Sequence, residues 1–264
     1  MWTSYHTHTL WSDGTSSLAA LCDAARAAGL DELGISDHYV CPDDGRAICW
    51  SMAPEALAAY VAAVLTAREE VGTLTLRLGL EVDYFPETVD TLRVRFAAYP
   101  FDYLIGSVHL LNDFPIDEDR QHWDALDPDA RVAQWRAYYR QLIRLADSGL
   151  CDIVGHLDLP KKFGLLPTAD LAVEVAAALD AISAANLTLE LNTAGWDKDV
   201  QEAYPSLEVL RQARRRDIPL VITADAHAPA ELTRHYPRAY ALAHDAGYTH
   251  LVRFHGRERE AVRM

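Results

Sequence analysis

Short apolar runs alternate with longer stretches of helical periodicity along the whole chain. Seven of these runs have the length and composition of buried strands, and we expect strands over 2–5, 32–36, 75–82, 103–108, 152–155, 187–191 and 220–224. The stretches between and after them predict helices over 18–28, 54–70, 87–96, 129–148, 169–185, 206–216 and 237–246. Gly29 and Gly149 stand where helix C-terminal caps belong, and Pro54 suits a first helical turn.

This alternation is typical of a parallel sheet with right-handed crossovers. Six runs end sharply on a histidine or a carboxylate, which is the place where parallel β/α barrels collect their chemistry. An open sheet would gather ligands mainly at one switch point, so we expect a closed, TIM-like barrel of seven β/α units. The sequence shows no repeat or linker, and residues 1–264 are predicted to form a single α/β domain, in which the last helix precedes a basic tail ending at Met264.

The charge balance narrows the possible partners. The chain has 24 basic and 39 acidic residues, a net charge of −15, which disfavours binding to nucleic acid. No apolar run approaches the ~20 residues that cross a bilayer, and the N-terminus lacks a secretory pattern. The four cysteines have no C-x-x-C spacing, so reduced thiols in a cytoplasmic protein are expected, although a Cys41–Cys49 disulfide stays open.

The residues at the strand ends predict a polynuclear metal site. His6 and His8 alternate on one strand and therefore point to the same face. With them we expect the ligands Glu81, His109, His156, Asp225 and His227, a mixture that zinc, iron and manganese all accept. His38 is a further candidate ligand, with Asp37 orienting a neighbour, and Asp13 is either a ligand or a turn residue. The other histidines, on loops and helices, are expected to be exposed.

Taken together, these motifs resemble those of the PHP (polymerase and histidinol phosphatase) superfamily. The resemblance rests on His6-Thr7-His8, Ser12-Asp13-Gly14, Ser36-Asp37-His38, Glu81, Gly106-Ser107-Val108-His109, Gly155-His156 and Asp225-Ala226-His227. Within the superfamily the chain is most similar to the monofunctional histidinol-phosphatases, through 190–195 and 204–206 and through its length.

The resemblance implies a distorted seven-unit barrel with two or three divalent zinc, iron or manganese ions. One ion would be held by His6, His8, Glu81 and Asp225, a second by Glu81, His109 and His156, and a third by Asp13, His38 and His227. Glu81, Asp225 and His227 are then the candidate catalytic residues. The implied reaction is hydrolysis of a small phosphate monoester, L-histidinol phosphate, to L-histidinol and phosphate by a metal-bound hydroxide, in histidine biosynthesis.

The phosphate anchors depart from the family pattern. Where the family has arginines, this chain has Lys161, Lys162 and Lys198, which are the candidate substrate-binding residues. Asp117, Asp158 and Trp196 are candidates for the ammonium and imidazole of the substrate.

Three other functions stay open at this point. The first is a PHP-type phosphoesterase acting on a nucleotide or another small phosphate ester, which the lysines allow. The second is an amidohydrolase-type deacylase, although no predicted strand ends on the lysine that this class uses. The third is a binding or regulatory module, although the full ligand set is present.

Overall fold

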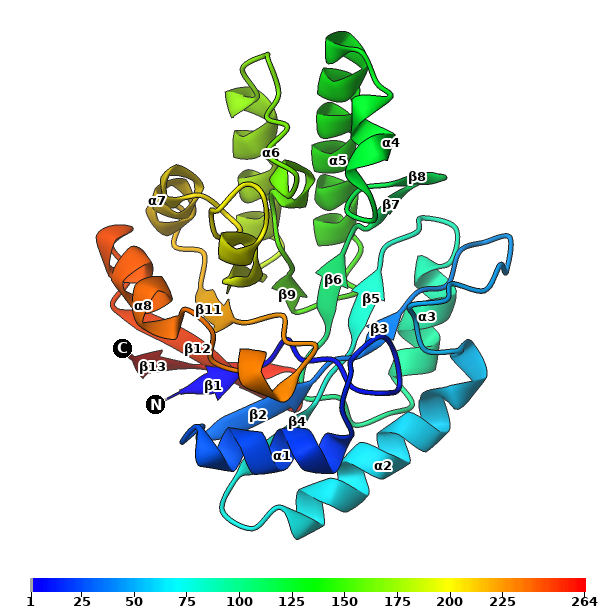
Figure 1. The fold of residues 1–264 in the computed structure, drawn as a ribbon, viewed down its shortest axis with the longest axis vertical. Coiled ribbons are helices and arrows are strands. Elements are labelled where there is room, and N and C mark those ends of the chain that lie inside the picture. Colours follow the sequence, from blue (N-terminus) through cyan, green and yellow to red (C-terminus); the bar gives the residue numbers. More distant parts are fainter. Residues whose placement is uncertain (1) are drawn as a thin grey trace.

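The computed structural model describes residues 2–264 and places parallel strands at the centre of the molecule, with helices around them (Figure 1). One parallel sheet contains, in spatial order, β1 (Thr3–Ser4), β2 (Glu32–Ile35) and β4 (Thr75–Leu78). A second contains β11 (Leu220–Thr223), β10 (Thr188–Asn192), β9 (Ile153–Val154), β6 (Ile105–Ser107), β5 (Glu81–Asp83) and β3 (His38–Tyr39).

The two sheets form one ring of strands. β3 continues the path of β2, and β5 continues that of β4, so residues 2–264 contribute seven parallel staves to the ring. The ring closes between the first and last staves, where Thr7 and Ala226 form a parallel bridge. There His8 N donates to Ala226 O at 2.8 Å, and Ala226 N donates to His6 O at 3.0 Å. The predicted seven-unit α/β barrel is therefore present, with its closure at the residues that carry the first histidines.

The predicted strand over 75–82 is wrong in one respect, because it is broken at Gly79 and Leu80. β4 pairs with β2, whereas β5 lies between β3 and β6. The Tyr60 hydroxyl lies 2.7 Å from Gly79 O and 3.0 Å from Ile35 O, so its single proton serves the carbonyls at the two interruptions, and Ile35 O also accepts from Gly79 N at 2.8 Å. A Cβ on Gly79 would lie 2.3 Å from the buried Tyr103 ring, which explains the glycine at this bend. The break distorts the barrel and turns Glu81 towards its centre.

The predicted helices are confirmed to within a few residues at each end. They are α1 (Leu18–Ala27), α2 (Leu57–Glu70), α3 (Val89–Phe96), α5 (Pro128–Asp147), α6 (Ala172–Ala184), α7 (Leu207–Arg215) and α8 (Tyr236–Asp245). Ser17, Asp127 and Ser206 begin α1, α5 and α7 by accepting a backbone N–H with the side chain. Apolar faces of these helices cover the outside of the strands, since leucines such as Leu21, Leu142 and Leu179 are fully buried.

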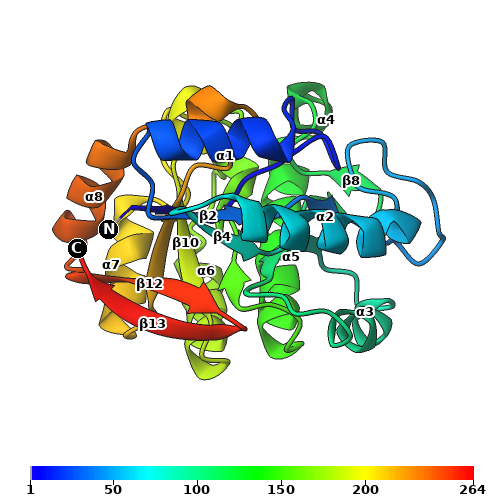
Figure 2. The same cartoon turned by 90° about the horizontal axis from the view of Figure 1, so that it is seen from below.

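Within residues 2–264, two hairpins and one short α-helix are additional to the predicted elements, as are 3₁₀ turns at Leu159–Lys161, Ala194–Asp197 and Pro229–Glu231. β7 (Leu110–Leu111) and β8 (Phe114–Pro115) form a small hairpin that precedes α4 (Arg120–Asp124). The chain end, predicted as a basic tail, is an antiparallel hairpin of β12 (His250–His255) and β13 (Glu258–Arg263), drawn in red in Figure 2. Its Val252 and Phe254 pack with Tyr5 and Tyr103 in a buried cluster that closes the N-terminal end of the strand ring.

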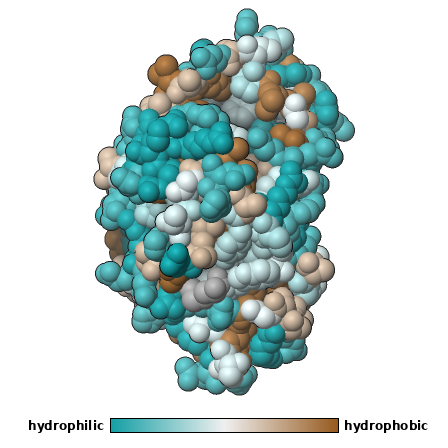
Figure 3. Space-filling view, turned by 90° about the vertical axis from the view of Figure 1, so that its left-hand side faces the viewer, coloured by the Kyte–Doolittle hydropathy of each residue, from teal (hydrophilic) through white to brown (hydrophobic). Residues whose placement is uncertain are grey.

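The surface is consistent with the acidic, polar composition. The face in Figure 3 is largely hydrophilic, with apolar side chains in small separate patches. Among residues 2–264, no helix has both the length and the apolar character needed to cross a membrane. The four cysteines, all within residues 2–264, are free in the structure, so Cys41 and Cys49 are not linked there.

Candidate metal centre

The C-terminal ends of the strands bring all nine predicted ligands to one end of the ring. His6 and His8 follow β1, His38 begins β3 and Glu81 begins β5. The remaining ligands lie just beyond β6, β9 and β11, except Asp13, which lies on the loop before α1: they are His109, His156, Asp225, His227 and Asp13. Residues separated by more than 200 positions therefore meet in one place, as expected for parallel strands.

Glu81 is the centre of this arrangement and is fully buried. Its Oε2 lies 3.1 Å from His6 Nε2, 2.7 Å from His38 Nδ1 and 3.7 Å from His8 Nε2. Its Oε1 lies 3.0 Å from His156 Nε2 and 3.6 Å from His109 Nε2. One carboxylate thus faces five imidazoles, and its two oxygens divide them into two sets, as expected of a carboxylate that bridges two cations.

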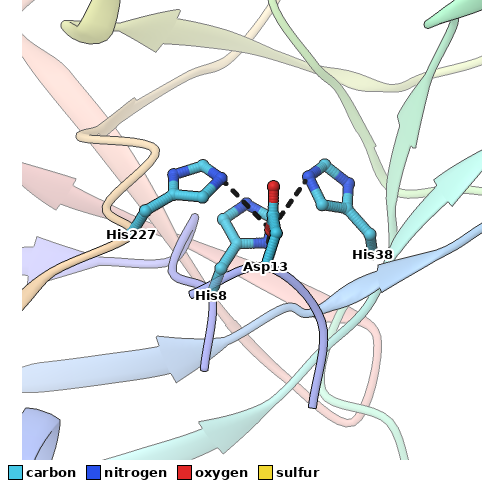
Figure 4. A group of neighbouring side chains, drawn as sticks. All are labelled: His8, Asp13, His38 and His227. Atoms are coloured by element: carbon cyan, nitrogen blue, oxygen red, sulfur yellow. Dashed lines mark ion pairs between the residues drawn. The ribbon is translucent and has the colours of Figure 1, made fainter. Parts of the chain in front are cut away.

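Asp13 forms a second meeting point, where it faces the imidazoles of His8, His38 and His227 (Figure 4). Its Oδ1 lies 3.4 Å from His227 Nε2, 3.7 Å from His38 Nε2 and 4.0 Å from His8 Nδ1. Of the two interpretations left open for Asp13, the structure therefore favours the ligand. Among residues 2–264, three overlapping groups could hold an ion: His8, Asp13, His38 and His227; His6, His8 and Glu81; and His38, Glu81 and His109.

Unpaired buried atoms test whether a metal fits this site. His6 Nε2, both ring nitrogens of His8, His38 Nδ1 and Glu81 Oε2 are buried and meet no partner at hydrogen-bond geometry within the described chain. Buried polar atoms are nearly always paired, so such a concentration needs an explanation. Imidazole nitrogens and carboxylate oxygens are the donors that zinc, iron and manganese accept. The donor set therefore fits divalent transition metals.

The electrostatics of the cluster point the same way. Burial opposes ionisation of Glu81, but the imidazoles of His6, His38 and His109 hold its pKa well below the usual range. Asp225 behaves alike, because the attraction of His6 and His8 outweighs burial and keeps its pKa well below normal. Burial beside His38 and His227 lowers the pKa of His8 to about 3, so His8 is a neutral imidazole with lone pairs to share. The Glu81 and Asp225 carboxylates therefore stay ionised although they are buried, and such buried negative charge is stable only beside positive charge.

Two further carboxylates orient the ligand histidines. Glu190, on β10, accepts from His6 Nδ1 at 2.6 Å, from the Thr223 hydroxyl at 2.7 Å and from His156 N at 2.7 Å. Asp83, on β5, lies 2.5 Å from His109 Nδ1. Each carboxylate leaves Nε2 of its histidine directed at Glu81, which is how metal-binding histidines are usually held. Sequence reasoning assigned neither residue this role, although Glu190 and Asp83 both lie on predicted or adjoining strand positions.

Asp37 has a different role from the predicted one. Its carboxylate accepts from the backbone N and hydroxyl of Thr9 at 2.7 and 2.8 Å, and from those of Ser12 at 3.1 and 2.6 Å. It therefore anchors the loop that presents Asp13 rather than a neighbouring imidazole. Gly14 lets this loop approach the first stave, since a Cβ there would lie 2.3 Å from His8 O.

Asp225 adopts a left-handed backbone conformation, with φ of 51°. This conformation is uncommon for a residue with a side chain, costs on the order of 1 kcal/mol or more, and recurs at functional sites. It brings Asp225 Oδ1 to 3.2 Å from His8 Nε2 and 3.6 Å from His6 Nε2. It also allows Ala226 to close the ring and His227 to face Asp13.

A cavity of about 370 Å³ opens above these ligands. Six of the nine predicted ligands line it: Asp13, His38, His109, His156, Asp225 and His227. Its wall also contains Trp50, Asp117, Lys162, Lys198 and Arg234. The volume suits a small organic molecule, and predicted metal ligands form its floor.

The three candidate lysines are placed differently. Lys162 and Lys198 line the cavity, and Lys162 Nζ lies 2.9 Å from Asp117 Oδ2. The prediction that Lys161 binds substrate is wrong. Lys161 is only 2% exposed, and its Nζ lies 2.8 Å from Asp158 Oδ2 and 2.7 Å from Glu202 Oε2. A buried ammonium paired with two carboxylates is held for structural reasons and is unavailable to a substrate. This pairing also occupies Asp158.

Of the predicted contacts for the organic half of the substrate, only Asp117 lines the cavity with the lysines. Trp196 is buried beneath the Arg238 guanidinium, which lies 4.3 Å from its ring centroid. Trp50 is an aromatic residue that lines the cavity, and its ring centroid lies 4.8 Å from that of His38 and 5.4 Å from that of His109, edge-on to both. Among the lone histidines, His122, His244, His250 and His255 are exposed, as predicted, whereas His235 is half-buried beside Asp197.

The motifs and the fold both have counterparts in known proteins. Residues 4–194 match the family model described as PHP domain. A protein of Deinococcus radiodurans named probable histidinol-phosphatase is 38% identical over 245 residues, covering 92% of this chain and 92% of the relative. The histidinol-phosphatase of Bacillus subtilis is 28% identical over 251 residues, covering 86% of this chain and 94% of the relative.

Among solved structures, the chain resembles a histidinol phosphate phosphatase from Lactococcus lactis, which is described as complexed with zinc, L-histidinol and phosphate. The TM-score is 0.82 over 98% of both chains, at 20% sequence identity. At this level of identity the likeness concerns the fold, and it confirms the predicted α/β barrel class.

Proposed function

The chain belongs to the PHP domain family, and from this premise we propose that it is a metal-dependent phosphomonoesterase that hydrolyses L-histidinol phosphate to L-histidinol and phosphate. The names of its relatives from Deinococcus radiodurans and Bacillus subtilis support this substrate. The observation that carries the proposal is the buried carboxylate Glu81, which faces five imidazoles beneath a cavity of about 370 Å³.

The ligand sets follow the division of donors around Glu81 and Asp13. His6, His8, Glu81 and Asp225 would hold one ion, Glu81 with His109 and His156 a second, and Asp13, His38 and His227 a third. Zinc, iron or manganese bound there would polarise the phosphoryl group and make water a nucleophile at neutral pH. Glu81, Asp225 and His227 serve the reaction as ligands whose charge and position fix the floor of the cavity.

The phosphate would be oriented by cationic side chains in the cavity wall. Lys198 and Lys162 are the residues we assign to this role, in place of the arginines of the family. Asp117 holds the Lys162 ammonium over the floor, and the pKa of Asp117 is lowered because the attraction of Lys162 and His109 outweighs burial. A lysine fixed in this way acts as a positioned point charge towards a phosphate oxygen.

The organic half of the substrate would lie towards the mouth of the cavity. Trp50 presents a half-buried indole there, and Glu118 and Glu231 add carboxylates to the same lining. An aromatic face and carboxylates together suit a cationic group such as the ammonium or imidazolium of histidinol. We therefore assign Trp50 to recognition of the organic half.

Three coarser features accompany this proposal. A small phosphate ester is the expected partner, since the net charge of −15 disfavours a nucleic-acid backbone. A cytoplasmic location is supported by the four free thiols. Residues 1–264 are proposed to act as one domain, because the β12–β13 hairpin packs into the same buried cluster as Tyr5 of the first stave.

The test is phosphate release from L-histidinol phosphate, measured beside a nucleoside monophosphate and a sugar phosphate. We expect kcat/KM for L-histidinol phosphate to exceed the others by about 100-fold or more. Exhaustive chelation should abolish the activity, and zinc or manganese should restore it. Activity that survives complete metal removal would contradict the metal mechanism, and a preference for the nucleotide would move the chain to another substrate.

A further inference from the structure

We infer that Arg234 is a positioning residue that fixes two metal ligands, Asp225 and His227, through their backbone. The inference rests on the metal centre of the proposed function but is independent of the substrate. It begins from the strained turn at the end of β11, where Asp225 takes its left-handed conformation and the next two residues close the ring and reach Asp13.

Arg234 donates hydrogen bonds to this turn through Nε and Nη2 of its guanidinium. Nε donates to Ala224 O at 3.0 Å, and Nη2 donates to Ala224 O at 2.7 Å and to Asp225 O at 2.8 Å. The side chain is only 14% exposed. Carbonyls of two successive residues are thus held at the point where the backbone leaves the strand conformation, which stabilises the strained turn.

The carbonyl of Asp225 that Arg234 binds also contacts the second predicted ligand, His227. The carbonyl oxygen of Asp225 lies 3.1 Å from His227 Nδ1, so it holds this ring with Nε2 facing Asp13. Glu231 accepts from His227 N at 2.7 Å and lies 3.4 Å from Arg234 Nη1. Arg234 therefore supports the side chain and the backbone N–H of His227 through two separate intermediaries.

The geometry separates this role from phosphate binding. An arginine has five N–H groups, and those on Nε and Nη2 already donate to the two carbonyls. Nη1 lies between Glu231, at 3.4 Å, and Asp197, at 3.6 Å. Although Arg234 lines the cavity, its donors face the protein.

Binding both carbonyls and Glu231 requires the several N–H donors of a guanidinium. A lysine at 234 keeps the charge and most of the length, but its single ammonium cannot hold both carbonyls and Glu231 in the planar arrangement of a guanidinium. The prediction is that Arg234→Lys weakens metal binding even though charge is conserved. Residues that support metal ligands in this way typically change affinity by about 10- to 100-fold when they are replaced.

The experiment measures metal affinity without any substrate. Arg234→Lys and Arg234→Ala are compared with the unchanged protein by competition with a chromophoric chelator for zinc, and by metal content after dialysis. We expect zinc affinity to fall about 10- to 100-fold, with part of the bound metal lost on dialysis. With zinc in excess, kcat should recover and KM for the phosphate ester should stay within about twofold.

Arg238→Lys is the matched control. Arg238 lies four positions further on, and its guanidinium stacks on Trp196 rather than on the turn at Asp225. It should bind zinc as the unchanged protein does.

Wild-type zinc affinity in Arg234→Lys, accompanied by a raised KM, would overturn the inference and make Arg234 a phosphate anchor. Wild-type affinity and wild-type KM would overturn it as well. If Arg234→Ala does not fold, the Lys variant still decides the question. Failure of the histidinol phosphate assignment would appear only in the activity assay and would leave the zinc titration intact.

Discussion

Buried carboxylates lie at both ends of the strand ring, but their partners differ. At the N-terminal end, Glu32 receives Arg77 Nε and Nη2 at 3.0 Å each, and Asp102 pairs with Arg68. At the C-terminal end, the ionisable neighbours of Glu81 are imidazoles, beside one hydrogen bond from the Ser107 hydroxyl at 2.6 Å, and no arginine or lysine lies at ion-pair distance within residues 2–264. The carboxylates at both ends are buried, so the two ends differ in the basic side chains that surround these carboxylates: arginines at one end and histidines at the other.

This difference separates stability from function. A guanidinium carries a permanent charge and a full set of donors, so the N-terminal carboxylates are satisfied within the protein. Imidazoles can be neutral and can present lone pairs, so the C-terminal cluster remains incomplete until cations are supplied. One end of the ring holds the barrel together, and the other is prepared to bind metal.

Glu81→Gln should have the largest effect at the metal-binding end of the ring. The amide keeps the shape of the side chain but removes the charge that two ligand sets share. Replacing an orienting residue costs about 10- to 100-fold, so loss of a shared ligand should lower kcat/KM by more than about 100-fold. Zinc content measured by mass spectrometry should fall at the same time, while circular dichroism shows a folded barrel. A fully active, fully metallated variant would show that Glu81 is not a ligand.

The opposite outcome is expected for Asp102→Asn at the other end. Asp102 Oδ2 accepts from Leu78 N at 2.8 Å and pairs with Arg68, and its side chain is 3% exposed. Removing one partner of a buried ion pair typically costs about 3–5 kcal/mol, and Arg68 is partly exposed, so we expect about 3 kcal/mol in the free energy of unfolding. Denaturant unfolding would measure this. Zinc content should be unchanged, and a variant that loses metal but not stability would erase the distinction between the two ends.

The sequence was informative where chemistry follows local position. His6 and His8 alternate on one strand, and Asp225 and His227 end another, so their convergence could be predicted from the strand pattern alone. The helices followed from apolar periodicity and caps, as Ser17 and Ser206 illustrate. These features can be predicted because they depend on residues that are close together in the sequence.

What could not be predicted depends on contacts between distant residues. Glu190 orients His6, which lies 184 positions away in the sequence, and the residues next to Glu190 do not indicate this partner. Lys161 has the same local appearance as Lys162, yet burial beside Asp158 removes it from the cavity. Arg234 acts on backbone carbonyls, whose positions depend on the left-handed turn at Asp225 rather than on residue type.

The smallest effect is expected for Trp50, which lines the cavity above the predicted metal ligands. Trp50→Leu keeps an apolar side chain but removes the aromatic face edge-on to His38 and His109. A cation–π contact contributes about 1 kcal/mol at a partly exposed site, so KM for L-histidinol phosphate should rise about fivefold with kcat little changed. KM for glycerol phosphate, which has no cationic group, should stay the same. Trp2→Leu, at the N-terminal end of β1, is the matched control and should leave both constants unchanged. Equal increases for both substrates would mean that Trp50 shapes the metal site rather than recognising the organic half, so metal content should be measured alongside.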